Sequence, residues 1–459
     1  MEKLPLILLT IFFSFQIIRH KGRNRLFWFI AGFLLCSSRI IIVTSPYIPS
    51  HRLLVFSLMF SELIRFRSFK LNWEKFPLKK SIVFITIVYI LIGLMDQRLS
   101  TFLKLYRPIY HTIETFFILF LAFSSIENTK DLNWIIKRLT PLVIFIMLFG
   151  IFNFITKQNP YDQLISSAFS SESAFEVYKN RAGDRFRINS FTDHPITYGY
   201  ICAVLATLYI FFPKSSLTIK KPLLVTTITL LIINLLFSNS RSPLLAFLLG
   251  VALIITFAFN LKTKFKLMFL AIPLFILSYL TIPFINEKVD AITDVFLTGG
   301  ENQEGSSMDM RYTQLAASYV LAMNNPIWGN GFAYIQEDLG WNSEDREYSS
   351  ELRGFESYIF VLLIETGLVG IIANLTIFLS IISYLFKKKR ENQRLSAIAI
   401  ALVSMFLIFI LATGTLNSWL ISMTFIGILI KVLELEKHDH NQNKSVTGNC
   451  YPRLQGNLS

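Results

Sequence analysis

Residues 355–386 read FESYIFVLLIETGLVGIIANLTIFLSIISYLF, a polar start followed by a long apolar run. About 20 consecutive apolar residues are enough for a helix to cross the hydrocarbon core of a bilayer. The whole chain agrees with this reading, since 53% of its 459 residues are hydrophobic and 44 are phenylalanine. A soluble domain could not cover so much apolar surface. The sequence therefore predicts an all-α polytopic membrane protein.

Twelve further apolar segments resemble the one at 357–386, which gives about 12–13 transmembrane helices in a single domain at 1–433. The others lie at 4–18, 26–46, 51–64, 81–96, 108–124, 136–156, 193–212, 222–238, 241–259, 267–284, 395–413 and 417–433. Residues 434–459 are polar and patternless, which predicts a disordered tail.

Lysine and arginine gather in alternate loops, and positive residues resist translocation across the membrane. The basic loops are 19–25, 65–80, 125–138, 213–221, 260–266 and 387–394, with roughly twice as many positive residues as the opposite loops. We therefore expect these loops and the tail to be cytoplasmic, and the long loops 157–192 and 285–356 to face outward. The net charge of +14 is then explained by topology and contact with membrane lipids, and no nucleic-acid partner is expected.

Metal-ligand patterns do not stand out. Three cysteines form no CxxC pair, and His194 has no second ligand at helical spacing, so it is predicted to start a helix. No metal or other cofactor is expected.

Arginines are placed where the outward loops meet the spans. Arg185 and Arg187 precede the span at 193, and Arg241 occupies the short turn SNSRSP between two apolar segments. A guanidinium group can bind phosphate as a planar fork, and an arginine at membrane depth suggests a partner. The alternative is that each one merely reaches the lipid headgroups.

The second outward loop carries Arg311 at the head of a predicted helix, with an apolar stripe at Leu315, Tyr319, Ala322 and Met323. In the following run NNPIWGNGF, Pro326 ends the helix, and Gly329 and Gly331 permit tight turns close to other backbone.

Glu356 stands at the mouth of the span that follows. A carboxylate entering a low-dielectric region has a raised pKa, which suits a general base near neutral pH. The equally weighted alternative is a charge placed for the dipole of the helix that begins there.

Taken in order, RFRINSFTDHP, SNSR, Arg311, NNPIWGNGF and FESYIFVLLIETGLVG resemble the O-antigen ligase and O-antigen polymerase superfamily of bacterial envelope glycosyltransferases. The resemblance covers about residues 180–385. It implies a metal-independent, inverting glycosyltransferase of the membrane-embedded GT-C type, working on the outer face of the bacterial cytoplasmic membrane. Its donor would be a glycan on undecaprenyl pyrophosphate, bound through Arg187 or Arg185, Arg241 and Arg311, with Glu356 as the catalytic base.

One departure separates the two activities of this superfamily. Its ligases carry a His-Asn pair where this chain has Glu356-Ser357, and a glutamate there resembles the polymerases. We therefore expect polymerisation of carrier-linked repeat units into O-antigen, capsule or exopolysaccharide, with an O-antigen ligase as the alternative. A chain-length regulator and a flippase are further expected partners.

A flippase for lipid-linked oligosaccharides is the alternative of another class. Such a transporter would be expected to carry charges along its spans and to show related halves. Here the polar chemistry gathers in the outward loops, which favours the enzyme.

Overall fold

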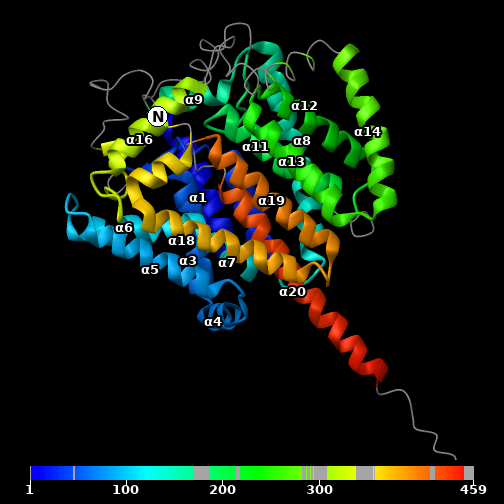
Figure 1. Ribbon diagram of the computed structural model, residues 1–459, viewed down its shortest axis with the longest axis horizontal. Helices are drawn as coiled ribbons and strands as arrows, with labels where there is room; N and C mark the ends of the chain where they lie inside the picture. Colours follow the sequence, from blue (N-terminus) through cyan, green and yellow to red (C-terminus); the bar gives the residue numbers. More distant parts are fainter. Residues whose placement is uncertain are drawn as a thin grey trace, which may run out of the picture.

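The computed structural model describes residues 2–44, 47–169, 186–212, 218–281, 308–337, 355, 357–413 and 419–448, together with residues 286, 290 and 293. Nearly all of this chain is helical, and the strands that it holds form a small antiparallel pair (Figure 1). The predicted all-α polytopic fold is confirmed.

The elements of the first part of the chain are α1 (Lys3–Arg19), α2 (Gly22–Leu35), β1 (Ile41–Val43), β2 (Ile48–Pro49), α3 (Ser50–Leu63), α4 (Phe66–Lys75), α5 (Lys79–Met95), α6 (Thr101–Thr112), the π-helix η1 (Ile113–Phe117), α7 (Ile118–Ser124), α8 (Asp131–Thr156) and α9 (Pro160–Phe169). The second part holds α11 (Pro195–Phe211), α12 (Lys221–Phe237), α13 (Arg241–Ala258), α14 (Leu261–Thr281), α16 (Met308–Ala322), α17 (Tyr334–Glu337), α18 (Tyr358–Lys388), α19 (Gln393–Leu411) and α20 (Trp419–Gly448).

Length and composition identify the clearest membrane spans. Within the described residues, α8, α13, α18 and α19 are each long and apolar enough to cross a bilayer, and the bent pair α4–α5 reaches this length and composition only when its two helices are taken together. Several other predicted spans are shorter helices, such as α11 and α12 with 17 residues each. A helix of that length reaches about 25 Å at 1.5 Å per residue.

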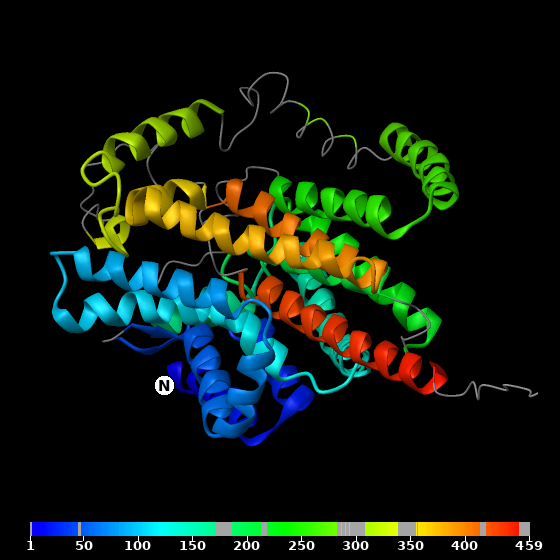
Figure 2. The ribbon, with the colours of Figure 1, turned by 60° about the horizontal axis from the view of Figure 1, so that its bottom comes forward.

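The centre of the bundle is α19. In the most apolar stretch of 18 residues in α19, 72% is buried inside the protein, against 39% for the corresponding stretches of α8 and α18. It packs against α13, α18, α20 and α11, and α18 in turn lies between α19 and α5 (Figure 2). Helices α13, α18 and α19 therefore form a fixed frame, and their ends position the loops between them.

Side-chain contacts join the predicted basic loops to one another. Arg23 pairs with Asp131 at 3.1 Å, Arg65 donates to the His20 carbonyl at 3.1 Å, and Arg394 donates to the Phe211 carbonyl at 2.8 Å. Lys388 and Glu434 pair at 3.1 Å, which adds the start of the C-terminal tail. These loops share one face, which we call the basic face; it includes α4 and the far end of α20 in Figure 1.

Contacts among other described segments lie on the opposite face. Arg39 binds Asp162 at 2.5 Å, Ser38 donates to Asp193 at 2.7 Å, and the Lys3 ammonium lies 5.5 Å from the centre of the Phe169 ring. We call this the loop face. The grouping of the long loops 157–192 and 285–356 and the outward orientation of the loop face stay predictions.

Two predicted segments differ from the structure. The span expected at 26–46 ends as a helix at Leu35, and its remainder enters the β1–β2 pair. The polar residues Ser37 and Ser38 interrupt the apolar run, and the β-branched residues after Arg39 favour an extended backbone. The tail expected to be disordered from 434 continues α20 as far as Gly448.

The apolar stripe predicted for α16 is largely exposed on the protein surface. Leu315, Tyr319 and Met323 of the predicted apolar stripe are 46%, 58% and 50% exposed, whereas Gln314 and Ser318 are fully buried. The helix packs on α18 through its small and polar side, and Ala322 is the one stripe residue that is buried. Small residues allow two helices to approach closely, which outweighs the pattern of hydrophobicity here.

Candidate functional site

Two of the predicted arginines meet at one turn. The Arg187 guanidinium donates from Nε to the Asn239 carbonyl at 3.2 Å and from Nη2 to Ser240 Oγ at 3.3 Å, directly before Arg241. The backbone N–H of Ile188 also bonds the Phe237 carbonyl at 3.4 Å. Arg187 and Ser240, which are 53 positions apart in the sequence, are thereby held side by side.

The local sequence explains this turn. Asn239 has φ 51°, a left-handed conformation that asparagine adopts more readily than most residues. Ser238 and Ser240 are buried, and Ser240 Oγ donates to the Ser238 carbonyl at 3.0 Å. Pro243 lies in the first turn of α13, where its missing N–H removes no helical hydrogen bond. Arg241 and Arg187 are both partly exposed, so an anion on the loop face can approach them.

The start of α18 lies at the same end of the bundle as this turn. Gly250 of α13 packs against Met405 of α19, and Gln393 at the start of α19 bonds the Phe257 carbonyl near the end of α13 at 2.6 Å. The two helices are therefore antiparallel, and Arg241 lies at the end where α19 finishes. The Tyr358 N–H bonds the Thr413 carbonyl just beyond α19 at 3.1 Å.

The run NNPIWGNGF fills a break in α18. Gly367 has φ 61° and ψ −163°, so the helix is interrupted there. The amide groups after the break bond the loop, Leu368 to the Pro326 carbonyl at 3.0 Å and Val369 to the Ile327 carbonyl at 3.1 Å. We call this arrangement the Gly367 junction.

The loop closes the junction from the other side. The amides of Asn330 and Gly331 bond the carbonyls of Ile364 and Glu365, each at 2.9 Å. Gly329 and Gly331 have φ 75° and 97°, and a β-carbon on Gly329 would strike the Glu365 backbone. The predicted role of these glycines in close backbone approach is thus visible in the structure.

Charged residues from α5 and α6 hold the far end of this loop. Arg107 donates to the Phe332 carbonyl at 2.8 Å and forms an ion pair with Glu337. Asp96, which binds Arg98 at 2.7 Å, lies against Gly331. The loop is therefore fixed both to α18 and to the α5–α6 connection.

Sequence reasoning did not single out Glu365. Its half-buried side chain lies close to the backbone amides of Ala333 and Ile335. The signal was available, because an ionisable residue inside an apolar span calls for a functional or structural partner.

A second unpredicted group lies within the spans at 51–64 and 108–124. Arg52 binds Glu114 at 2.5 Å and lies 3.7 Å from the centre of the Tyr110 ring. The spans are thus less free of charge than the sequence suggested. Glu114 belongs to η1, and π-helical turns of this kind are frequent at functional sites.

The structure describes the two sequence neighbours of the predicted base. Phe355 is buried in a small cluster with Ile335 and Ile364, and Ser357 is the N-cap of α18. Glu356 itself and Arg185 lie outside the described residues. Arg311 is in the first turn of α16. The hydrogen bonds described above bring Arg187 to the turn directly before Arg241.

His194 has the predicted helix-start role. It is the N-cap of α11, and its Nδ1 accepts the Ile196 N–H at 3.0 Å. Over the ranges that the structure describes, no group of three or more His, Cys, Asp or Glu side chains is arranged to hold a metal ion.

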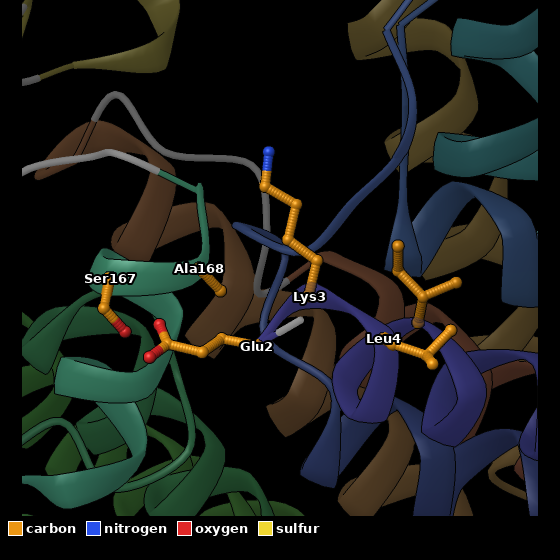
Figure 3. A pocket seen from close by; sticks show the side chains of 6 residues that line it. Glu2, Lys3, Leu4, Ser167 and Ala168 are labelled. Carbon is orange, nitrogen blue, oxygen red and sulfur yellow. The ribbon is translucent and has the colours of Figure 1, made fainter.

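A surface pocket of about 540 Å³ lies elsewhere on the loop face, between the start of α1 and the end of α9. Figure 3 shows the Glu2 side chain directed toward Ser167, with Lys3 pointing away from it. None of the predicted site residues lines this pocket.

Comparison with known families gives a match over the central third of the chain. Residues 226–375 match the family model described as O-antigen ligase. The match spans the turn at Arg241, the loop 326–331 and the Gly367 junction. No curated protein matches the chain.

Proposed function

We propose that this chain polymerises oligosaccharide repeat units carried on undecaprenyl pyrophosphate, and the match of residues 226–375 to the O-antigen ligase family model supports this class of reaction. The reaction takes place on the loop face, which we assign to the outside of the bacterial cytoplasmic membrane. It joins the glycan of one carrier to the non-reducing end of another.

The contact of Arg187 with the turn before Arg241 carries this proposal. Both side chains are partly exposed on the loop face, at the end of the bundle where α18 begins. A pyrophosphate has several acceptor oxygens, and two guanidinium groups can bind it through charge-assisted hydrogen bonds. Arg311 is assigned to the same anion as a third group.

The chemistry then needs one base. The hydroxyl oxygen of the acceptor sugar attacks the anomeric carbon of the donor, and the bond from that carbon to the pyrophosphate oxygen breaks. Glu356 takes the hydroxyl proton, and the arginines offset the charge on the departing undecaprenyl pyrophosphate. Attack from the side opposite the leaving group inverts the configuration at the anomeric carbon.

Glu356-Ser357 favours polymerisation over ligation, because superfamily ligases resembling this chain carry His-Asn at that place. The ligase remains the second candidate, and its acceptor would be lipid A-core or another outer lipid. A chain-length regulator and a flippase are proposed as partners of the polymerase.

A strain that lacks the protein is expected to lose its ladder of long polysaccharide chains and to retain single repeat units. Wild-type protein should restore the ladder, whereas Arg241→Ala should not, since it removes one of the paired cations. Arg394→Ala is the matched control, because this arginine lies on the basic face and donates to the Phe211 carbonyl. Gel electrophoresis of the extracted polysaccharide gives the result.

Other outcomes of the same experiment separate the alternatives. Long chains that stay on the carrier would identify a ligase. Repeat units trapped on the cytoplasmic side would identify a flippase. A normal ladder with Arg241→Ala would remove the arginine pair from the mechanism.

Chelation provides an independent check of the proposed metal-independent mechanism. If arginines take the place of a divalent cation, the rate of transfer by the purified protein should stay within about twofold of its original value after treatment with EDTA. Chain lengthening in proteoliposomes is the measurement. Loss of activity that magnesium or manganese restores would contradict the assignment of the leaving-group charge to arginines.

A further inference from the structure

We propose that α4 and its flanking residues form a binding surface for anionic phospholipid headgroups in the leaflet at the basic face. The axis of α4 turns by 104° from that of α5, which begins at Lys79. Since α5 runs from the basic face to the loop face, α4 lies along the surface rather than through the bundle. It is seen at the edge of the molecule in Figure 1.

One side of α4 is fixed by aromatic packing. The Phe69 and Trp73 rings lie 5.2 Å and 4.9 Å from the ring of Phe120 in α7, measured between centroids. These contacts set the rotation of the helix about its own axis. The opposite side therefore has a defined direction, away from the bundle.

That opposite side combines apolar and basic residues. Arg67, Leu71 and Lys75 are spaced four residues apart, which places them on one face of the helix, and all three are exposed. Leu71 is 52% exposed on this side, and Phe66, which stacks on Phe69 at the start of the helix, is 65% exposed. Apolar side chains flanked by lysine and arginine are the pattern of a helix lying at the boundary between headgroups and acyl chains.

The charge of the segment selects the kind of lipid. Residues 65–80 contain the basic residues Arg65, Arg67, Lys70, Lys75, Lys79 and Lys80, and the single acidic residue Glu74. Arg65 is engaged with the Ser61 and His20 carbonyls, and Lys79 with the Glu74 carbonyl. Arg67, Lys70, Lys75 and Lys80 are exposed, and a positive surface of this density attracts anionic headgroups.

The test uses the full-length protein with a fluorophore on Leu71→Cys, in a Cys450→Ser background; the other two cysteines are buried. The protein is placed in phosphatidylcholine vesicles that contain phosphatidylglycerol, and the quencher is attached to the acyl chains of either lipid in turn. We expect quenching to be several-fold stronger from phosphatidylglycerol than from phosphatidylcholine. High salt should bring the ratio toward one, because salt screens exposed charges.

A pair of matched charge reversals locates the effect. Arg67→Glu with Lys75→Glu should abolish the preference for phosphatidylglycerol. Lys262→Glu with Lys266→Glu changes the same charge at exposed positions on the same face and should preserve the preference. The salt titration needs only the labelled protein, without a charge reversal, and decides the question if the first pair fails to fold.

Two results would overturn the proposal. Equal quenching by both lipids in low salt would mean that α4 does not select anionic headgroups. A label that neither lipid quenches would place position 71 in water, where a soluble partner could dock but the bilayer does not.

Discussion

Glu356→Gln is expected to lower the rate of glycan transfer by about 10²- to 10⁴-fold, the usual contribution of a general base. The amide has nearly the shape of the carboxylate, but it cannot take the proton from the acceptor hydroxyl. Binding of the donor depends on the arginines and should change little. Chain lengthening in proteoliposomes measures the rate, and retention of a labelled lipid pyrophosphate by the purified protein measures binding.

A matched control separates loss of the base from loss of charge. Glu74→Gln makes the same chemical change on α4, at an exposed position of the basic face, and should leave transfer at the wild-type level. Transfer by Glu356→Gln at the wild-type rate would refute the assigned base. Equal loss of donor binding and transfer would move Glu356 from catalysis to binding.

The spans and the arginine turn were predictable because each leaves a local signal. Long apolar runs identify helices, and an arginine in the four-residue neighbourhood SNSR has few structural reasons to be there. The sequence predicted only that Arg187 and Arg241 bind the same ligand, and it did not predict the contact of Arg187 with Ser240, since sequence alone does not pair residues from separate loops. The structure supplies that pairing through backbone contacts between Ile188 and Phe237.

The sequence alone does not predict the Gly367 junction, and the reason is physical. Gly367 lies in an apolar run that would form an unbroken helix, and an isolated glycine is tolerated in such a helix. The break becomes stable only because a distant loop supplies backbone partners to Leu368 and Val369. The same limit applies to α16, whose buried side was decided by close packing on α18 and not by its apolar stripe.

Gly367→Ala is expected to disrupt this junction and to abolish transfer. A β-carbon there would lie 2.5 Å from the Ile327 carbonyl oxygen and 2.6 Å from the Gly329 nitrogen, both of them backbone atoms. The backbone at φ 61° and ψ −163° is also a conformation that is nearly restricted to glycine. Relief of this strain requires the loop to move away, which would break the four backbone hydrogen bonds between the loop and α18.

Backbone strain alone should lower the free energy of unfolding by about 2 kcal/mol, and the broken hydrogen bonds should lower it further. Because Phe355 packs on Ile335 and Ile364 at this junction, the segment that carries Glu356 should lose its position as well. We therefore expect a lower Tm, faster proteolysis within 326–337, and no chain lengthening.

Leu368→Ala tests the same place without a backbone clash. Leu368 is 53% exposed, and its amide can still bond the Pro326 carbonyl when the side chain is shortened. This variant should keep its proteolytic resistance and its activity. If Gly367→Ala kept the same proteolytic resistance and activity as Leu368→Ala, the loop would not need the break in α18. The junction would then not position the start of α18 for catalysis.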